Sequence, residues 1–452
     1  MPPALALILC CSLIIYAFQL DFKRKSEVTN ALWIPLLWMM IASSRFISQW
    51  IEIGSGSLST SDIEEGSPLD RVVFGALLLS GVIVLMQRRV RTSEVLGQNK
   101  WLLVWFIYCG VSIGWSDFPD IAFKRYVKGI GTVIMVLIVL TEPNPKESLK
   151  ALVRRCGYVL LPLSLLFIKY YRDIGVGYDE WTGETIYVGA ALNKNTLGRL
   201  TLVCAFFFFW SLVAMWRHRK RTMVTKEWWI YVLFFVLSVW LLRLAGSATS
   251  VGVLVAGILV FVGFETPMIK KNRRQTGIII LVSLLLFLAL DQAMGITEFV
   301  VVEVFGRNMT FTDRAYLWKD LLDMETNPII GTGYDSFWLG QRLDIIWDKY
   351  RWQPTESHNG YLETYLDLGL IGLVLLAGCI LAIGRNIEKT LVYDFELGKV
   401  RMAFLVMVLL YNLTEASFKG LTLMWLMFLL ISVDAWRLEN RNAIRSVKSH
   451  FR

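Results

Sequence analysis

His358 is the residue of this chain whose type best suits proton transfer. It is one of three histidines and lies in the segment 357–360 (Ser-His-Asn-Gly), where a long polar stretch meets an apolar one. The other two, His218 and His450, lie among basic residues, which indicates solvated side chains. A neutral imidazole with its ordinary pKa of about 6.5 can accept a proton near neutral pH. We therefore expect His358 to act as a general base. The alternative is a histidine that only hydrogen-bonds the loop at a helix start.

A second set of side chains carries positive charge at the ends of apolar stretches or inside them. A guanidinium group keeps its charge and can bind phosphate oxygens through two parallel hydrogen bonds, so these residues are candidates for binding a phosphate-bearing ligand. Arg199 is the strongest of these candidates, because a full charge inside an apolar stretch is costly unless it meets an anion. Its alternative is an ion pair with Glu415 or Asp291. The other candidates are Arg243, Arg125, Lys124, Lys128, Lys194 and Arg314.

Most of these cations have a structural alternative. Lys124 and Lys128 share one face of a helix, and long basic side chains near a membrane often reach lipid phosphates. Arg314 alternatively pairs with Asp313 or Asp320 on a solvated face.

Three polar residues are candidates for orienting the imidazole or binding sugar hydroxyls: Asn359, Glu363 and Glu415. Helix capping or charge pairing would explain the two carboxylates equally well. Helical positions five apart are displaced around the axis, so contact between Glu363 and His358 is not assured.

The composition places these residues in a membrane protein. The chain has 452 residues, of which 55% are hydrophobic and 18% charged, and its mean hydropathy is +0.52. A soluble core of this length would not bury so much apolar surface. Apolar stretches near the ~20 residues that cross a bilayer predict about 12 or 13 helices. They are residues 5–20, 31–50, 72–86, 101–115, 127–140, 152–168, 197–216, 228–244, 246–264, 277–293, 361–383, 397–413 and 421–436.

The net charge of +9 reports topology and not a nucleic-acid partner. Basic residues cluster on every second loop, which predicts that those loops face the cytoplasm. They lie at residues 23–25, 88–91, 146–155, 217–221, 270–274, 385–399 and in the tail from 437. The outer loops then include residues 52–70, 169–193 and 294–357. The six cysteines have no metal-ligand spacing and are expected to be small buried residues.

The longest outer loop ends just before His358. With this loop and the basic tail, the chain has four expected segments. We expect a helical bundle over residues 1–293, a periplasmic loop with short amphipathic helices over 294–357, the rest of the bundle over 358–436, and a basic cytoplasmic tail over 437–452. Within the loop, residues 308–318 predict a polar cap and an amphipathic helix that Asn327-Pro328 terminates, and residues 331–334 a turn. Trp338, Trp347 and Trp352 suit a membrane interface or sugar stacking, and we do not count them as site residues.

Several segments in order resemble the bacterial O-antigen ligase and O-antigen polymerase superfamily, from about Trp101 onward. They are residues 115–119 (Trp-Ser-Asp-Phe-Pro), 192–198 (Leu-Asn-Lys-Asn-Thr-Leu-Gly), 246–250 (Gly-Ser-Ala-Thr-Ser), 313–314 with 317–318, 328–338 and 357–369. One departure is Ala248, where many ligases have an arginine after the serine. Arg243, one turn earlier, is a candidate substitute; the alternative is that the difference marks the polymerase branch.

The resemblance implies an inner-membrane, membrane-embedded glycosyltransferase fold. It implies inverting transfer of a glycan from undecaprenyl diphosphate at the periplasmic face, with neither a metal nor another cofactor. A ligase uses lipid A core as acceptor, whereas a polymerase uses another lipid-linked repeat unit. The segments at 115–119, 192–198 and 246–250 are closer to exopolysaccharide polymerases than to core ligases. Polysaccharide assembly proteins are possible partners of such a polymerase. The alternative from another class is a flippase for lipid-linked oligosaccharide, which would need no base on one face.

Overall fold

The structure is a computed structural model, and it describes residues 1–24, 27–51, 66–89, 97, 99–178, 183–217, 226–267 and 314–433. The expected span 277–293 and the basic tail lie outside these residues. The described residues form two compact units. Unit 1 comprises Met1–Asn99, Val127–Leu254 and Gly420–Arg452, and unit 2 comprises Lys100–Tyr126 and Val255–Lys419.

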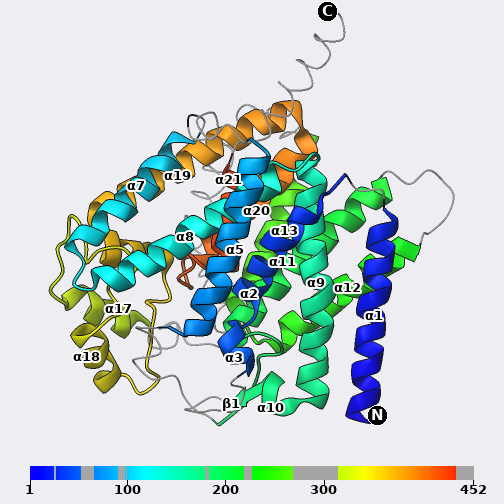
Figure 1. The fold of residues 1–452 in the computed structure, drawn as a ribbon, viewed down its shortest axis with the longest axis horizontal. Helices are drawn as coiled ribbons and strands as arrows, with labels where there is room; N and C mark the ends of the chain where they lie inside the picture. The colour runs from blue at the N-terminus through cyan, green and yellow to red at the C-terminus, as the bar shows by residue number, and fades with distance from the viewer. Residues whose placement is uncertain are drawn as a thin grey trace, which may run out of the picture. The chain divides into compact units, whose positions relative to one another are not determined.

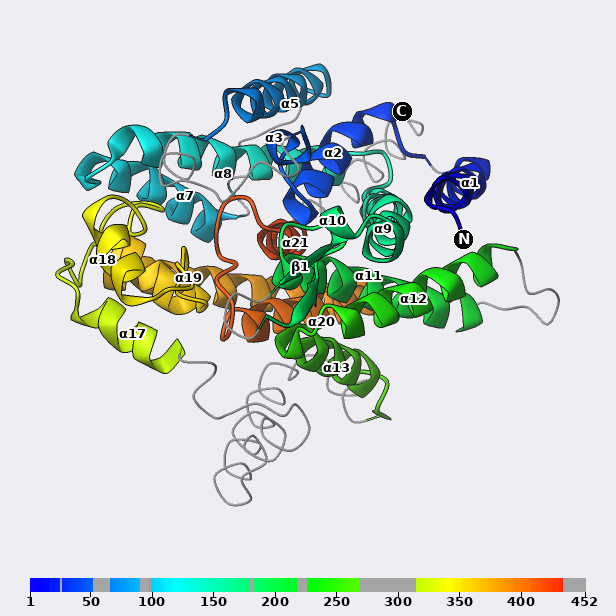
Figure 2. The same cartoon turned by 90° about the horizontal axis from the view of Figure 1, so that it is seen from below.

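Unit 1 is helical apart from one short ribbon. Its elements are α1 (Pro3–Lys23), η1 (Asn30–Leu32), α2 (Trp33–Ser43), α3 (Ile47–Ile51), α5 (Pro68–Gln87), α9 (Pro145–Tyr170), α10 (Arg172–Gly175), β1 (Val176–Tyr178), β2 (Thr185–Tyr187), α11 (Lys194–Arg217), α12 (Lys226–Leu244) and α21 (Leu423–Ser432). The strands pair antiparallel, with Val176 opposite Tyr187. Helices α11 and α12 pack side by side and both contact α9, as Figure 2 shows.

Unit 2 contains α7 (Lys100–Ser112), η2 (Ile113–Trp115), α17 (Arg314–Asp323), α18 (Gln341–Lys349), α19 (Gly360–Tyr393) and α20 (Phe395–Tyr411). Helix α7 runs alongside α19 (Figure 1), and α19 also packs on α20. Two further helices continue from one unit into the other, α8 (Pro119–Leu140) and α13 (Ala248–Gly263). The predicted all-α polytopic class is confirmed. Within the described part of the chain, six helices have the length and apolar composition needed to cross a bilayer, and four shorter apolar helices coincide with further expected spans.

The expected single span over residues 31–50 is wrong. Helix α2 ends at Ser43, and α3 begins at Ile47. Between them, the guanidinium group of Arg45 donates hydrogen bonds to the carbonyls of Ile174, at 2.7 Å, and Ala191, at 3.0 Å. Arg45, at the break, thus gives two backbone carbonyls near the β ribbon a charged donor.

The basic stretch at residues 146–155 was expected to be a loop and instead belongs to α9. The side chain of Asn144 caps this helix by accepting the N–H of Glu147, at 3.1 Å, and Pro145 is its first residue. Arg154 and Arg155 are buried because both donate to the carboxylate of Asp21 in α1. The stretch at 385–399 is likewise mostly helical, since α19 extends to Tyr393 and α20 begins at Phe395.

The predicted amphipathic helix is α17, which ends at Asp323 and not at Asn327, while the polar cap expected before it lies outside the described residues. The predicted turn at residues 331–334 is confirmed. This turn is joined to α19, where Gly369 interrupts the helix with φ +64°. The N–H groups of Leu370 and Ile371 donate to the carbonyls of Pro328, at 2.9 Å, and Ile329, at 3.1 Å. The loop thus satisfies backbone groups that the interruption releases, as an apolar environment requires.

The tryptophans of the loop pack inward. Trp338 is only 4% exposed and belongs to a cluster with Leu317, Phe337 and Leu366, so it is a core residue and not an interfacial one. Trp347 and Trp352 are half-buried against the same cluster. All six cysteines are free, and five of them are buried as expected, whereas Cys11 is exposed.

Candidate active site

His358 precedes α19 in a constrained backbone conformation. Its φ is +51°, a left-handed value that non-glycine residues rarely adopt. Directly after it, Asn359 is the N-cap of α19, and its side chain accepts the N–H groups of Tyr361, at 3.0 Å, and Leu362, at 3.1 Å. The prediction that His358 lies at a helix start is confirmed, and Asn359 has an evident structural function as the cap.

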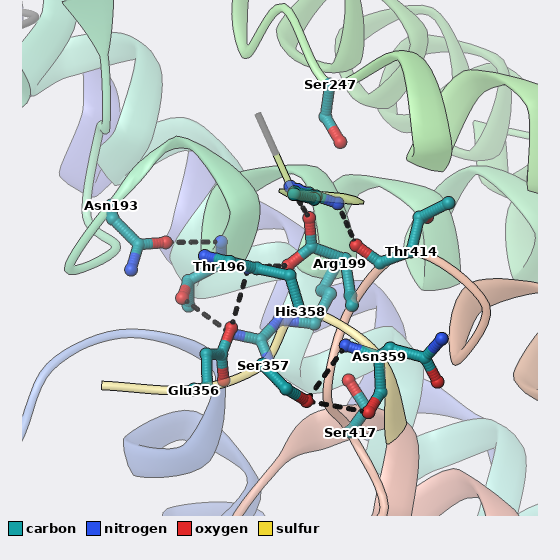
Figure 3. A network of polar contacts seen from close by, with 12 residues as sticks. Asn193, Thr196, Arg199, Ser247, Glu356, Ser357, His358, Asn359, Thr414 and Ser417 are labelled. Atoms are coloured by element: carbon teal, nitrogen blue, oxygen red, sulfur yellow. Dashed lines mark hydrogen bonds and ion pairs between the residues drawn. The ribbon is translucent and has the colours of Figure 1, made fainter. Parts of the chain in front are cut away.

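Two carboxylates face the imidazole of His358. Its Nδ1 lies 3.3 Å from Oε1 of Glu356 and 3.5 Å from Oε2 of Glu415 (Figure 3 shows the surrounding residues). The ring also stacks on Trp352, with 5.6 Å between ring centroids. The side chain retains 17% exposure.

The carboxylates change the expected protonation of His358. Burial alone would lower its pKa, but hydrogen bonds and charge from Glu356 and Glu415 outweigh burial and raise the pKa to about 9. The expectation of a pKa near 6.5 is therefore wrong. At neutral pH the imidazole holds both protons, and it becomes a base as it loses one of them.

Arg314 binds Glu415 and not the aspartates near it in sequence. Its Nη2 lies 3.1 Å from Oε1 of Glu415, and its Nη1 donates to the carbonyl of Thr414. Asp320 instead pairs with Lys349, at 2.7 Å, and Asp313 lies outside the described residues. Arg314 is thus engaged in orienting one of the carboxylates that face His358.

Glu363 does not contact the imidazole. Its Oε2 accepts the N–H of Ser357, at 2.8 Å, and its Oε1 pairs with Lys419. The indole N–H of Trp318 donates to the carbonyl of the same Ser357, at 2.7 Å. Glu363 therefore orients the backbone just before His358.

Glu356 and Lys419 are site residues that the sequence interpretation missed. Glu356 lies two residues before His358, and a carboxylate so near a candidate base was an available signal. Lys419 lies in a short segment between two apolar helices, on a side where few cations are expected, and that position was also a signal.

Among the candidate cations of unit 2, Arg125 also has a carboxylate partner. Its side chain donates to the backbone carbonyl of Asp335 and lies 3.6 Å from the Asp335 carboxylate. Lys124, one residue earlier in α8, is exposed. Arg125 is therefore paired with a carboxylate, whereas the side chain of Lys124 is exposed on the surface.

Four candidate cations belong to unit 1. Arg199 donates to Thr196 at 2.9 Å, while its Nε is buried and has no hydrogen-bond partner among the described residues. Lys194 begins α11, and Arg243 is exposed near the end of α12. Lys128 lies 5.4 Å above the ring of Phe74, a cation–π contact.

Arg199 lies beside a close helix contact. A Cβ at the preceding Gly198 would come within 2.7 Å of Oγ of Ser250 and 2.9 Å of Cβ of Ser247. Ser247 in turn accepts the N–H of Ser250 at the start of α13, and their hydroxyls lie 2.9 Å apart. Asn193, Thr196, Arg199 and Ser247 are drawn in Figure 3. Ser247 thus has a described structural role, and Ala248 begins the helix.

The ligand atoms of Glu356, His358 and Glu415 lie within 4.8 Å of one another, a spacing that a metal ion could use. Arg314 and Lys419 already neutralise these carboxylates. We therefore interpret the cluster as a set of ion pairs. The expectation that no cofactor is needed stays a prediction.

The helices and their composition define an all-α polytopic membrane protein. A sequence profile of the family described as O-antigen ligase matches residues 233–377, which include Arg243, Arg314 and His358. The chain is also 24% identical over 287 residues to the exopolysaccharide production protein ExoQ of Rhizobium meliloti (strain 1021). That match covers 61% of this chain and 62% of the relative, which is less than two thirds of its length. Both findings are similarities of this chain to the O-antigen ligase family and to an exopolysaccharide production protein, in agreement with the resemblance of its sequence motifs.

Proposed function

We propose that the protein is a glycosyltransferase of the inner membrane that polymerises surface polysaccharide at the periplasmic face. The donor is a glycan on undecaprenyl diphosphate, and the acceptor is a sugar hydroxyl of another lipid-linked repeat unit. The single observation that carries this proposal is His358, held at the start of an apolar helix between Glu356 and Glu415. Similarity to the O-antigen ligase family and to an exopolysaccharide production protein supports this class of reaction.

In the proposed reaction, the acceptor oxygen forms a bond to the anomeric carbon as the bond from that carbon to the diphosphate oxygen breaks. The acceptor proton passes to His358 once Nε2 is deprotonated, and undecaprenyl diphosphate leaves with the bonding electrons. Attack opposite the leaving group inverts the anomeric configuration. Glu356 and Glu415 favour the imidazolium that forms, which is the reason that paired carboxylates suit a histidine base.

The leaving diphosphate needs positive charge. We propose that Arg199 and Arg243 bind it, because Arg199 has a buried Nε with no described partner and Arg243 is exposed near the end of a neighbouring helix. Lys194, Lys124 and Lys128 are secondary candidates. Arg125 and Arg314 have carboxylate partners, which supports a positioning role for them. With arginines neutralising the diphosphate, the proposed reaction requires no metal.

The experiment is single-turnover transfer by purified protein in proteoliposomes, with undecaprenyl-diphosphate repeat unit as the sole substrate. We expect a ladder of products that persists in a metal chelator. His358→Ala should lower the rate by about 10²–10⁴-fold at equal folded amount, the range for a lost general base. The matched control is Lys389→Ala, because Lys389 is exposed on α19. A full rate in His358→Ala would overturn the role of the histidine.

The matching profile is described as O-antigen ligase, which supports a second candidate function. A ligase would form product only when lipid A core is added. Translocation of the lipid-linked glycan without any bond formation would instead indicate a flippase. The same proteoliposomes distinguish the three functions. A polymerase gives a ladder of products and a ligase gives a core-linked product, which differ in mass, whereas a flippase leaves the donor chemically unchanged but on the other side of the membrane.

A further inference from the structure

Lys419 lies between two carboxylates beside His358. Its Nζ contacts Oε1 of Glu363 and lies 4.0 Å from Oε2 of Glu356. Glu356 in turn lies 3.3 Å from Nδ1 of His358. One ammonium group therefore separates a carboxylate that faces the imidazole from one that does not.

Glu363 connects Lys419 to the backbone before His358. Its other oxygen accepts the N–H of Ser357, and Trp318 donates to the carbonyl of Ser357. Both backbone groups of Ser357 are thus fixed. The next residue, His358, has φ +51°, a conformation that costs a non-glycine residue energy and persists where its surroundings hold it.

We propose that Lys419 is a positioning residue, which keeps Glu363 on the backbone of Ser357 so that Glu356 and Glu415 are the two carboxylates facing His358. The importance of Lys419 for catalysis rests on the proposed function. The arrangement of charges around His358 is independent of that function, because it follows from the contacts in the structure.

The charged groups around His358 balance when the imidazole is protonated. Glu356 from the preceding loop, Glu415 from the segment after α20 and Glu363 from α19 are negative. Arg314 from α17 and Lys419 are positive, and the protonated imidazole is the third cation. Among these described residues, three positive charges then face three negative charges. Removing Lys419 leaves buried negative charge without a partner, which favours the protonated imidazole more strongly.

Asp335 adds a further negative charge near Lys419. Burial would lower the pKa of Lys419, but Glu363, Glu356 and Asp335 outweigh burial and raise it. Asp335 in turn contacts Arg125. Lys419 is therefore charged at any pH at which the protein works, and its effect on His358 is constant.

The test is an NMR titration of histidine-labelled protein in nanodiscs. The chain has three histidines, so the His358 signal is identified by its loss in His358→Gln. We expect Lys419→Met to raise the titration midpoint of His358 by about one pH unit, because a nearby cation is lost. Lys419→Arg should keep the wild-type midpoint, and Lys389→Met, at an exposed site, is the control for loss of one lysine. An unchanged midpoint in Lys419→Met overturns the proposal.

A second variant covers the case in which Lys419→Met does not fold. Glu363→Gln removes the partner that holds Lys419, which should then pair with Glu356 and lower the midpoint. A raised or unchanged midpoint would contradict the proposal. The transfer assay tests the role of Lys419 separately from the role of His358 as base. If Lys419→Met moves the titration midpoint of His358 but not the pH dependence of transfer, Lys419 is a positioning residue and His358 is not the base.

Discussion

Gly360 lies in direct contact with Asn412. The N–H of Gly360 donates to the carbonyl of Asn412 at 2.9 Å, and a Cβ at position 360 would come within 2.0 Å of Oδ1 of Asn412. That oxygen also accepts the N–H of Ser417, at 2.8 Å. The start of α19 is thereby joined to the segment that carries Glu415, and this contact brings Glu415 to His358 across 57 positions of sequence.

We predict that Gly360→Ala destabilises the protein and separates Glu415 from His358. The added methyl group meets a buried, hydrogen-bonded side chain, and overpacking of this kind costs about 1–3 kcal/mol. The measurement is the thermal midpoint in detergent, together with the His358 NMR midpoint, which should fall as one carboxylate moves away. Gly384→Ala is the control, because that glycine lies in the same helix with nothing within 4 Å of its added Cβ. Equal midpoints for the two variants would show that the contact is not restrictive.

The rate of transfer should rise with pH up to about 9. A base acts when deprotonated, and His358 has a pKa of about 9, so the single-turnover rate should increase about tenfold per pH unit below that value. Glu356→Gln removes one of the groups that raise the pKa and should move the rising limb to lower pH. A profile that is flat from pH 6 to pH 9 in the wild type would argue against a histidine base.

Stability should show the same titration without any substrate. The pKa of His358 is about 9 in the folded protein and about 6.5 in an unfolded chain, so its ion pairs contribute fully below pH 6.5. That contribution, on the order of 3 kcal/mol, is lost as the pH rises from 6.5 through 9. The measurement is the difference in thermal midpoint between wild type and His358→Gln. It should be large at pH 6 and small at pH 9.5, and a difference that grows with pH would contradict the charge arrangement.

Arg199 should matter for the donor. We expect Arg199→Gln to lower kcat/KM for undecaprenyl-diphosphate glycan by roughly 10–100-fold, the effect of losing a charge-assisted hydrogen bond. Arg199→Lys should recover part of this, since it keeps the charge but not the planar fork. Arg172→Gln is the control, because Arg172 is an exposed arginine of the same unit. An Arg199→Gln enzyme with wild-type kcat/KM would remove this residue from the proposed diphosphate site.

Sequence periodicity predicted the helices well and their ends less well. Apolar stretches placed α1, α5, α11 and α12 within a few residues, because hydrophobic length alone decides whether a helix can span a bilayer. It failed at residues 31–50, where Arg45 binds carbonyls more than a hundred positions away. It also began a span at residue 152, after a basic loop, whereas α9 begins at Pro145 and Asp21 of another helix neutralises Arg154 and Arg155 within it. In both cases the deciding partner is distant in sequence.

The sequence by itself determined the class of protein, the histidine at a helix start and the set of cations available for a diphosphate. These depend on composition, local pattern and residue type, which need no knowledge of contacts. The tertiary structure decided that Glu356 and Glu415 face His358, that Lys419 lies between Glu356 and Glu363, and that the two facing carboxylates raise the pKa of the imidazole. The reason is physical: a pKa follows from burial and from charges within a few ångströms, and chain folding alone sets both.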